Sequence, residues 1–500
     1  MMDIVNIDWS LVLEQLLYNP KQPMIFSSGI FMFLFLGFSF IYWCLHRTDT
    51  LRILFVTLFS YYFYYKSSGF YFALLAVVTV SDWLIGRGIH QIQQKNGSRA
   101  AQRWLVLLSL VIDLGLLGYF KYTNFFYSLA APLWGGNFQP LDIFLPVGIS
   151  FFTFQSLSYT IDIYRGTLTP LSRLLDYTFY VSFFPQLVAG PIVRARDFVP
   201  QIRKPLFVSN RMIGQAVFLI MAGLLKKAVI SDYISVNFVE RIFDNPSLYS
   251  GLENLLGIYG YTLQIYCDFS GYSDMAIGIA LLLGFRFPQN FNSPYKSDSI
   301  TDFWRRWHIS LSSWLRDYLY ISMGGNRCSR WRMYFNQLMT MLLGGLWHGA
   351  SLNFIVWGGL HGIALCVHKA FRSAMGYGKN HHNTGIVRFI NIVLTFHFVA
   401  FCWLFFRNSS FENSWLMITR IFTDFRADLL PQLWDGYTPV LSLMIIGYAL
   451  HWVPESWTTH CRHLVMRLPL LLQAVLLIAV IYLIIQVKSS DIQPFIYFQF

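Results

Sequence analysis

Apolar runs of helix-spanning length follow one another along almost the whole chain. A transmembrane helix needs ~20 predominantly apolar residues, and several runs reach or approach this length. They lie near residues 24–44, 51–65, 70–86, 104–127, 143–165, 212–236, 252–285, 335–348, 351–370, 388–407, 438–454 and 469–487. Some are short or interrupted by glycine, which is typical of re-entrant or internal helices. The pattern predicts an all-α polytopic membrane protein with about eleven to thirteen membrane segments, re-entrant helices included.

Basic residues are unevenly distributed among the polar loops. Residues 87–103 hold four Lys or Arg and residues 194–211 hold five, whereas 129–142 hold none and 238–250 hold one. Because cytoplasmic loops are enriched in Lys and Arg, the first two loops are predicted to be cytoplasmic and the other two to lie outside. Threading the runs accordingly places both termini outside. It also makes 176–193 a re-entrant segment on the cytoplasmic face.

The composition narrows the class of protein and its partners. Only 12% of the residues are charged and 55% are hydrophobic, whereas soluble domains carry roughly 25% charge. Basic cytoplasmic loops account for the net charge of +12, so we expect membrane lipid, and no nucleic acid, as a partner. The six cysteines are scattered without a CxxC pair, so we expect no metal site. With no long polar linker and no internal repeat, residues 1–500 are predicted to form a single membrane domain.

His348 is the most informative candidate for chemistry. It stands in the run Gly344–Ser351 (GGLWHGAS), inside a long apolar stretch. Ionisable groups at membrane depth are costly and usually face a protein-lined cavity where they function. An imidazole can take and return a proton near neutral pH. The surrounding residues 335–370 are predicted to form a helical hairpin with His348 at or near its turn.

The segment 295–332 is the densest polar candidate, with seven basic residues and three acids. Helical spacing would place His308 and Ser312 on one face, with Arg305 and Arg306 beside it. Arginines suit an anionic, phosphate-bearing substrate such as a nucleotide-linked acyl donor. The alternative is that they anchor the protein to lipid phosphates at the membrane surface. His308 could equally be a core histidine that bonds Ser312.

A second polar cluster, Tyr266–Asp274, contains Asp268 and Ser270 in an otherwise apolar span. Such groups would either line a substrate tunnel or join helices through hydrogen bonds, and the sequence leaves both open. The chain has no GxSxG, GxxxxGKS, HExxH or GxGxxG motif. Local motifs therefore do not support a serine hydrolase, an ATP-driven pump or zinc catalysis.

Several long motifs resemble those of the membrane-bound O-acyltransferase family, and most of all its bacterial, alginate-acetylating branch. They are Asp268–Gly278 (DFSGYSDMAIG), Asp302–Tyr318 (DFWRRWHISLSSWLRDY), Gly324–Arg327 (GGNR) and Gly344–Ser351. Supporting stretches are Gly118–Phe126, Pro146–Tyr159, Pro185–Val193 and Phe398–Arg407. The resemblance spans most of residues 25–410 and is looser over 411–500.

The resemblance implies helices around a central tunnel and acyl transfer from a thioester to a hydroxyl. His348 would be the essential histidine that accepts the hydroxyl proton, and His308 the second catalytic histidine. A transient acyl-histidine stays open as an alternative. Acetyl-CoA or another acyl thioester would be the donor substrate, and no cofactor would be bound. The expected substrate-binding and supporting residues are Arg305, Arg306, Asp268, Ser270, Ser312 and Asn353.

The resemblance also implies a cellular task. The protein would move an acetyl group across the bacterial inner membrane for O-acetylation of an extracytoplasmic polysaccharide, together with a separate periplasmic or anchored acetyltransferase- or esterase-like partner. Transfer of D-alanine to teichoic acid, or of acetyl to peptidoglycan or cellulose, is the alternative within the family. A proton-coupled transporter, with His348, His308 and Asp268 as a relay, is the alternative of another class. The chain lacks the paired broken helices that transporters commonly show.

Overall fold

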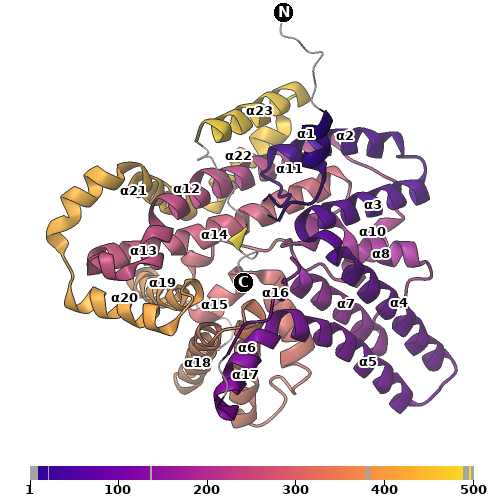
Figure 1. The fold of residues 1–500 in the computed structure, drawn as a ribbon, viewed down its shortest axis with the longest axis horizontal. Helices are drawn as coiled ribbons and strands as arrows, with labels where there is room; N and C mark the ends of the chain where they lie inside the picture. The colour runs from indigo at the N-terminus through magenta and orange to yellow at the C-terminus, as the bar shows by residue number, and fades with distance from the viewer. Residues whose placement is uncertain (1–8, 21, 136–137, 379–382, 488–494, 497–500) are drawn as a thin grey trace, which may run out of the picture. The chain divides into compact units, whose positions relative to one another are not determined.

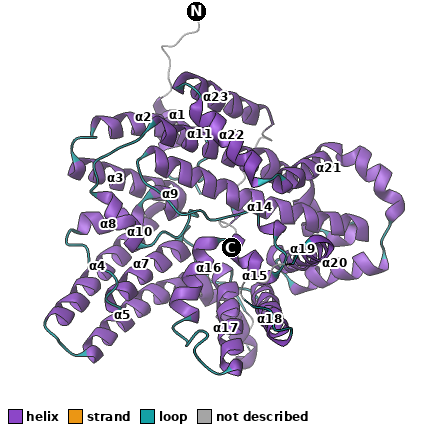
Figure 2. Ribbon diagram, turned by 180° about the vertical axis from the view of Figure 1, so that it is seen from behind, coloured by secondary structure: helices purple, strands orange, loops and turns teal. Residues whose placement is uncertain are grey.

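Every regular element that the structure describes is a helix. The computed structural model describes residues 9–20, 22–135, 138–378, 383–487 and 495–496, and the absence of strands holds for these ranges (Figure 2). The predicted all-α class is confirmed. The helices form two compact units. Unit 1 holds the described residues of Met1–Val208, Leu283–Arg286 and Ile492–Gln499, and unit 2 holds those of Ser209–Leu282 and Phe287–Asp491.

Unit 1 is built from ten helices in the described part of the chain. They are α1 (Trp9–Leu16), α2 (Gly29–Cys44), α3 (Asp49–Ser68), α4 (Phe72–Gln94), α5 (Arg99–Leu117), α6 (Thr123–Ala130), α7 (Ile149–Tyr164), α8 (Leu174–Ser182), α9 (Phe184–Leu187) and α10 (Ala195–Ile202). Helices α4, α5 and α7 pack together around the buried Asp82. The Ser109 hydroxyl donates to this carboxylate over 2.6 Å, and that of Thr160 over 3.4 Å. One acidic side chain thus joins three helices.

Unit 2 carries the motifs that the sequence singled out. Its helices are α11 (Asn210–Leu224), α12 (Asp232–Ile234), α13 (Glu240–Asp244), α14 (Gly251–Leu282), α15 (Ile300–Arg306), α16 (Ile309–Trp314), α17 (Arg330–His348), α18 (Leu352–Ala374), α19 (Gly385–Arg407), α20 (Phe411–Thr423), α21 (Leu430–Trp452), α22 (Glu455–Arg467) and α23 (Leu470–Val487). The 32-residue α14 packs most extensively against α11. Helices α17 and α18 lie side by side (Figure 1).

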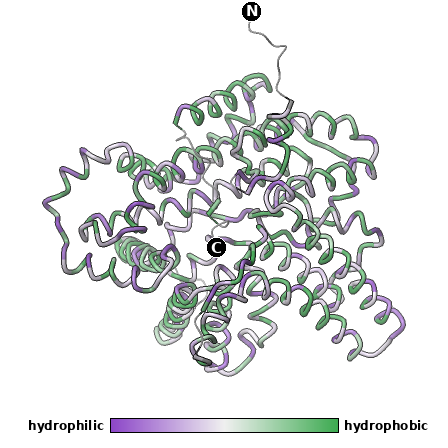
Figure 3. The backbone as a smooth tube through the Cα atoms, in the orientation of Figure 1, coloured by the Kyte–Doolittle hydropathy of each residue, from purple (hydrophilic) through white to green (hydrophobic). Residues whose placement is uncertain are grey.

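Six helical segments are long and apolar enough to cross a membrane, so this is a multi-pass membrane protein. They are Asp49–Gln94, Arg99–Leu133, Asn210–Asp244, Leu352–Ala374, Gly385–Arg407 and Leu470–Val487. A bent pair, Ala427–Trp452 with Glu455–Arg467, is a seventh candidate. The last of the six, α23, has a mean hydropathy of 2.7, and Figure 3 shows α23 and α19 as largely green.

This count, made over the described residues, includes only long apolar helices, whereas the eleven to thirteen segments expected from the sequence also include short and re-entrant ones. Helices α2 and α7 have only 16 residues each, which is below the ~20 that a span needs. Helix α17 opens on Arg330 and Arg332. The expected re-entrant segment 176–193 forms α8 and α9, which are separated at Phe183. Its position at the cytoplasmic face stays a prediction.

Candidate active site

His348 is the last residue of α17 and lies at the turn of a helical hairpin. Gly349 has an extended backbone (φ −163°, ψ 153°), and α18 begins three residues later at Leu352. The extended backbone ends the helix because it cannot continue the i to i−4 hydrogen bonding. The predicted hairpin with His348 at its turn is confirmed.

Two glycines allow the hairpin to close tightly. A Cβ atom at Gly345 would overlap the carbonyl oxygen of Phe354 and lie 3.1 Å from the Cα of Gly358. A Cβ atom at Gly358 would overlap the carbonyl oxygen of Met341. Backbone atoms of α17 and α18 are therefore in direct contact one turn before His348. This contact explains why the motif needs a glycine at Gly345.

The His348 side chain is buried in a cage of aromatic rings. It is 3% exposed, and its ring lies 4.8 Å from that of Trp347, 5.1 Å from Trp357 and 5.2 Å from Phe406, centroid to centroid. These rings come from α17, α18 and α19. Packing from three helices fixes the position of the imidazole and excludes bulk water from most of its surface.

His308 lies at a break between two short helices. Its backbone is left-handed (φ 44°, ψ 56°), α15 ends at Arg306, and α16 begins at Ile309. The prediction of one continuous helix across His308 is therefore wrong, because a left-handed residue ends the α-helical run. The Ser312 hydroxyl donates to the carbonyl of Trp307 over 3.2 Å. Ser312 thus supports the backbone around His308.

Aromatic contacts bring His308 and His348 to one place. The His308 ring lies 4.5 Å from that of Phe269 on α14 and 6.4 Å from that of Trp347. Trp347 therefore contacts both histidine rings. Burial lowers the pKa of His308 to about 3, so this imidazole is neutral at physiological pH. The structure thus groups two of the predicted residues, His348 and His308, around one indole.

Asn290, which the sequence analysis missed, is the polar partner of His308. It is 1% exposed, and its Oδ1 pairs with His308 Nδ1 at 3.1 Å. The same oxygen accepts from the backbone N–H and the hydroxyl of Ser310, over 3.1 and 2.9 Å. Asparagine in a turn-rich loop commonly bonds nearby backbone, and this is the signal by which it could have been found.

Asp268 lies in a buried ion cluster. Its carboxylate is 2.5 Å from Lys227 Nζ, which is also 2.8 Å from Asp232. Side chains of Lys227 and Asp268 are only 3% and 2% exposed. A lysine between two carboxylates compensates charges that would be costly in an apolar interior. Asp268 therefore joins α14 to the π-helical stretch Leu225–Ser231 that follows α11.

Helices α14 and α11 approach each other closely enough for the side chains of this ion cluster to meet. A Cβ atom at Gly271 on α14 would lie 2.8 Å from the carbonyl oxygen of Gly223 on α11. Lys226, next to Lys227, reaches Asp274 at 2.6 Å. Ser270 is 1% exposed on the same turn of α14. The DFSGYSD motif thus places polar groups against α11 and Phe269 against His308.

The remaining predicted residues lie at the edges of this region. Arg306 is half-buried, and its Nε donates to Asp302 over 2.8 Å, whereas Arg305 is exposed. The Asn353 side chain is 2% exposed and donates to the carbonyl of Asn408 over 2.8 Å. Asn353 thereby ties the start of α18 to the residue after α19. A substrate-binding role for these three residues stays a prediction.

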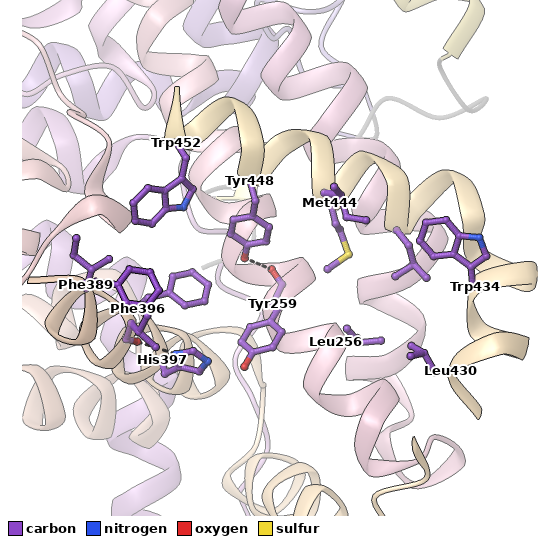
Figure 4. A pocket seen from close by; sticks show the side chains of 14 residues that line it. Leu256, Tyr259, Phe389, Phe396, His397, Leu430, Trp434, Met444, Tyr448 and Trp452 are labelled. Atoms are coloured by element: carbon purple, nitrogen blue, oxygen red, sulfur yellow. Dashed lines mark hydrogen bonds between the residues drawn. The ribbon is translucent and has the colours of Figure 1, made fainter. Parts of the chain in front are cut away.

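Among the described residues, neither a metal cluster nor the apolar pocket of Figure 4 coincides with His348 or His308. Within the described residues, no group of three or more His, Cys, Asp or Glu is arranged to hold a metal ion. A pocket of about 560 Å³ opens between α14, α19 and α21, and its lining is almost wholly apolar (Figure 4). There the Tyr448 hydroxyl donates to the carbonyl of Tyr259 over 2.8 Å. None of the predicted site residues is among the fourteen that line it.

Comparison with known proteins identifies the family. A sequence model of the membrane-bound O-acyltransferase family matches residues 170–411, which include both histidines. The probable alginate O-acetylase AlgI of Pseudomonas aeruginosa is 43% identical over 80% of this chain and 75% of its own length. The chain belongs to the membrane-bound O-acyltransferase family. It is accordingly an O-acyltransferase, as the motifs indicated.

Other members of the O-acyltransferase family are also similar to this chain. The peptidoglycan O-acetyltransferase of Helicobacter pylori is 38% identical, covering 78% of each chain. The teichoic acid D-alanyltransferase of Bacillus subtilis is 31% identical over 53% of this chain and 70% of its own. Similarity is thus more extensive to the two O-acetylating relatives than to the D-alanylating one.

Proposed function

We propose that this membrane-bound O-acyltransferase moves acetyl groups from a cytoplasmic thioester, acetyl-CoA in the simplest case, across the membrane for O-acetylation of an extracytoplasmic polysaccharide. The grouping of His348 and His308 around Trp347, inside the family-matched region, carries the proposal. The names of the alginate and peptidoglycan relatives support acetyl as the group and a polysaccharide as the acceptor.

In the proposed reaction, His348 is the general base. It takes the proton of the acceptor hydroxyl while that oxygen attacks the thioester carbonyl, so a C–O bond forms and the C–S bond breaks. The proton then passes to the leaving thiolate, which departs as the free thiol. Proton transfer of this kind contributes typically 10²–10⁴-fold to the rate. The imidazolium formed in between lies at the C-terminal end of α17, where the helix dipole stabilises positive charge.

His308 acts in this proposal as the second catalytic histidine and remains neutral. The exposed Arg305 and the half-buried Arg306 would hold the phosphates of the donor. Asp268, Ser270, Ser312 and Asn353 would support the site through hydrogen bonds and, for Asp268, through its ion pair with Lys227. Of these, Ser312 is nearest in sequence to His308.

Because the acetyl group has to cross a membrane in this proposal, the protein's location and orientation are part of it. The protein would lie in the bacterial inner membrane with both termini outside, as the basic loops 87–103 and 194–211 favour. A separate periplasmic or anchored acetyltransferase- or esterase-like protein would complete transfer to the polymer.

Reconstitution into proteoliposomes tests the proposal. Acetyl-CoA labelled in its acetyl group is supplied, and both released CoA thiol and labelled hydroxyl acceptor are measured. We expect His348→Ala to lower turnover by about 10²–10⁴-fold while the protein remains folded. His397→Ala, a matched control at an exposed histidine of α19, should keep wild-type turnover.

Two results would overturn parts of the proposal. Equal turnover of His348→Ala and wild type would show that His348 is not the base. If the wild type consumed a D-alanyl thioester instead of acetyl-CoA, the acyl group would be D-alanine, as the name of the Bacillus relative indicates for that protein.

A further inference from the structure

Asn290 binds the segment around His308 through three side-chain contacts and one backbone hydrogen bond, and its side chain also bonds to α14. Its Oδ1 accepts from Ser310 N and Ser310 Oγ and pairs with His308 Nδ1. Its Nδ2 donates to the hydroxyl oxygen of Ser273 on α14, over 3.2 Å. Its own carbonyl accepts from the N–H of Ile309 over 2.9 Å. One buried side chain thus links α14 to the break between α15 and α16.

This geometry determines which ring nitrogen of His308 carries the proton. A backbone N–H only donates, so the side-chain atom that faces Ser310 N must be the amide oxygen of Asn290. An amide oxygen only accepts, so His308 Nδ1, which faces the same oxygen, must donate. The neutral ring therefore has its proton on Nδ1, and its lone pair is on Nε2.

The same contacts hold a backbone conformation that a histidine rarely adopts. His308 has φ 44° and ψ 56°, a left-handed conformation that persists only where the surroundings enforce it. Asn290 contacts all three consecutive residues His308, Ile309 and Ser310. These contacts fix both the direction in which the imidazole projects and its rotation about Cβ.

We propose that Asn290 is a positioning residue for acyl transfer: it holds His308 in the left-handed turn with Nδ1 protonated, so that Nε2 is the acceptor atom that His308 contributes to the reaction. The role of Nε2 rests on the proposed function, in which His308 takes part in the reaction. The placement and tautomer of His308 rest on the hydrogen bonds alone.

Substitutions at Asn290 distinguish a role in positioning His308 from a role in packing alone. Asn290→Leu keeps the branched shape of the side chain and removes every side-chain hydrogen bond, so we expect kcat to fall about 10- to 100-fold with KM for the donor little changed. Asn290→Asp keeps an oxygen that accepts from His308 Nδ1 and Ser310, so it should restore kcat to within a few-fold of wild type. Ser273→Ala, the matched control, removes only the partner of Nδ2 and should leave kcat near wild type.

A spectroscopic measurement on the wild type keeps the test independent of any variant that folds poorly. The protein is labelled with ¹⁵N-histidine, and the His308 signals are identified by their loss in His308→Gln. We expect Nδ1 protonated and Nε2 unprotonated. The opposite tautomer, or wild-type kcat in Asn290→Leu, would overturn the proposal, as would equal loss of kcat in Asn290→Leu and Asn290→Asp.

If the proposed catalytic role of His308 is wrong, the same measurements give a different combination of results. If His308→Ala kept wild-type turnover while the wild type showed the expected tautomer, His308 would have no part in catalysis, and Asn290 would still be shown to fix its conformation.

Discussion

Gly345→Ala tests whether close contact between α17 and α18 places His348 for catalysis. The added methyl group would overlap the carbonyl oxygen of Phe354 and lie 3.1 Å from the Cα of Gly358. Both obstacles are backbone, so neither can rotate away. Gly344→Ala is the matched control, because its methyl group would meet only the Cδ1 atom of Leu315 at 3.2 Å, the mobile end of a side chain.

The size of the effect follows from the required displacement. Carbon and carbonyl oxygen pack at about 3.3–3.6 Å, so the two helices must separate by roughly 1 Å at this point. A displacement of 1 Å in a catalytic group can lower the rate by about 10²-fold. Overpacking costs about 1–3 kcal/mol, and replacing glycine in a helix returns about 1 kcal/mol. We therefore expect a large loss of rate with a small loss of stability.

The assay compares turnover and thermal unfolding of the two alanine variants in the same proteoliposomes. Gly345→Ala should lose about 100-fold in acetyl transfer and a few degrees in melting temperature, while Gly344→Ala keeps both. Equal turnover in the two variants would refute the reasoning, because it would mean that the hairpin contact does not position His348. Restored turnover on adding a larger donor concentration would also refute it, since a misplaced base lowers kcat and not donor affinity.

Three further predictions concern other contacts. Lys227→Met leaves Asp268 and Asp232 without their shared cation and should destabilise the fold by about 3–5 kcal/mol. Its melting temperature should be lower than that of the control Lys226→Met, whose lysine is 29% exposed. Equal melting temperatures in the two variants would contradict this prediction. Arg305→Ala should raise KM for acetyl-CoA roughly tenfold through the loss of a charge-assisted hydrogen bond, and the melting temperature should not change. An unchanged KM would assign this exposed arginine to lipid contact. Burial lowers the pKa of His308 from 6.5 to about 3, so the folded protein keeps this imidazole neutral where the unfolded chain would protonate it. The stabilisation of the folded state by neutral His308 is therefore complete above pH 6.5 and falls as the pH drops towards 3. At pH 5 the loss is about 2 kcal/mol. His308→Gln should therefore show a smaller drop in melting temperature between pH 7 and pH 5 than wild type, and parallel curves would contradict the assignment.

The hairpin around His348 could be predicted from the sequence because its determinants are local. Gly349 and Ser351 interrupt an apolar helical pattern between residues 335 and 370, and a break of this kind is a strong turn signal. The all-α class was equally accessible, since it depends on the length of apolar runs. Apolar runs do not show, however, which short helices end inside the protein and which cross the membrane.

The geometry around His308 could not be predicted because it depends on contacts between distant residues. Helical spacing over 304–315 favours one continuous helix, and nothing within that segment indicates a left-handed residue. The break is held by Asn290, eighteen residues earlier in the chain. Likewise, the sequence shows Lys227 and Asp268 as charges in apolar surroundings, but only the approach of Gly223 to Gly271 pairs them.

The ion cluster of Lys227 also has a consequence for how the protein is made. If the segment Asn210–Asp244 left the translocon alone, Lys227 would have only Asp232 as a partner and Lys226 would lack Asp274. An uncompensated charge near the bilayer centre costs about 2.5–3.5 kcal/mol. Only residues 245–250 separate it from α14, which brings Asp268 and Asp274. We expect the two segments to enter the lipid together as a hairpin. In glycosylation mapping, a nascent chain that ends after Asp244 should insert less efficiently than one that extends through Leu282, and Lys226→Met should remove part of the difference. Equal insertion of the two lengths would contradict a paired entry.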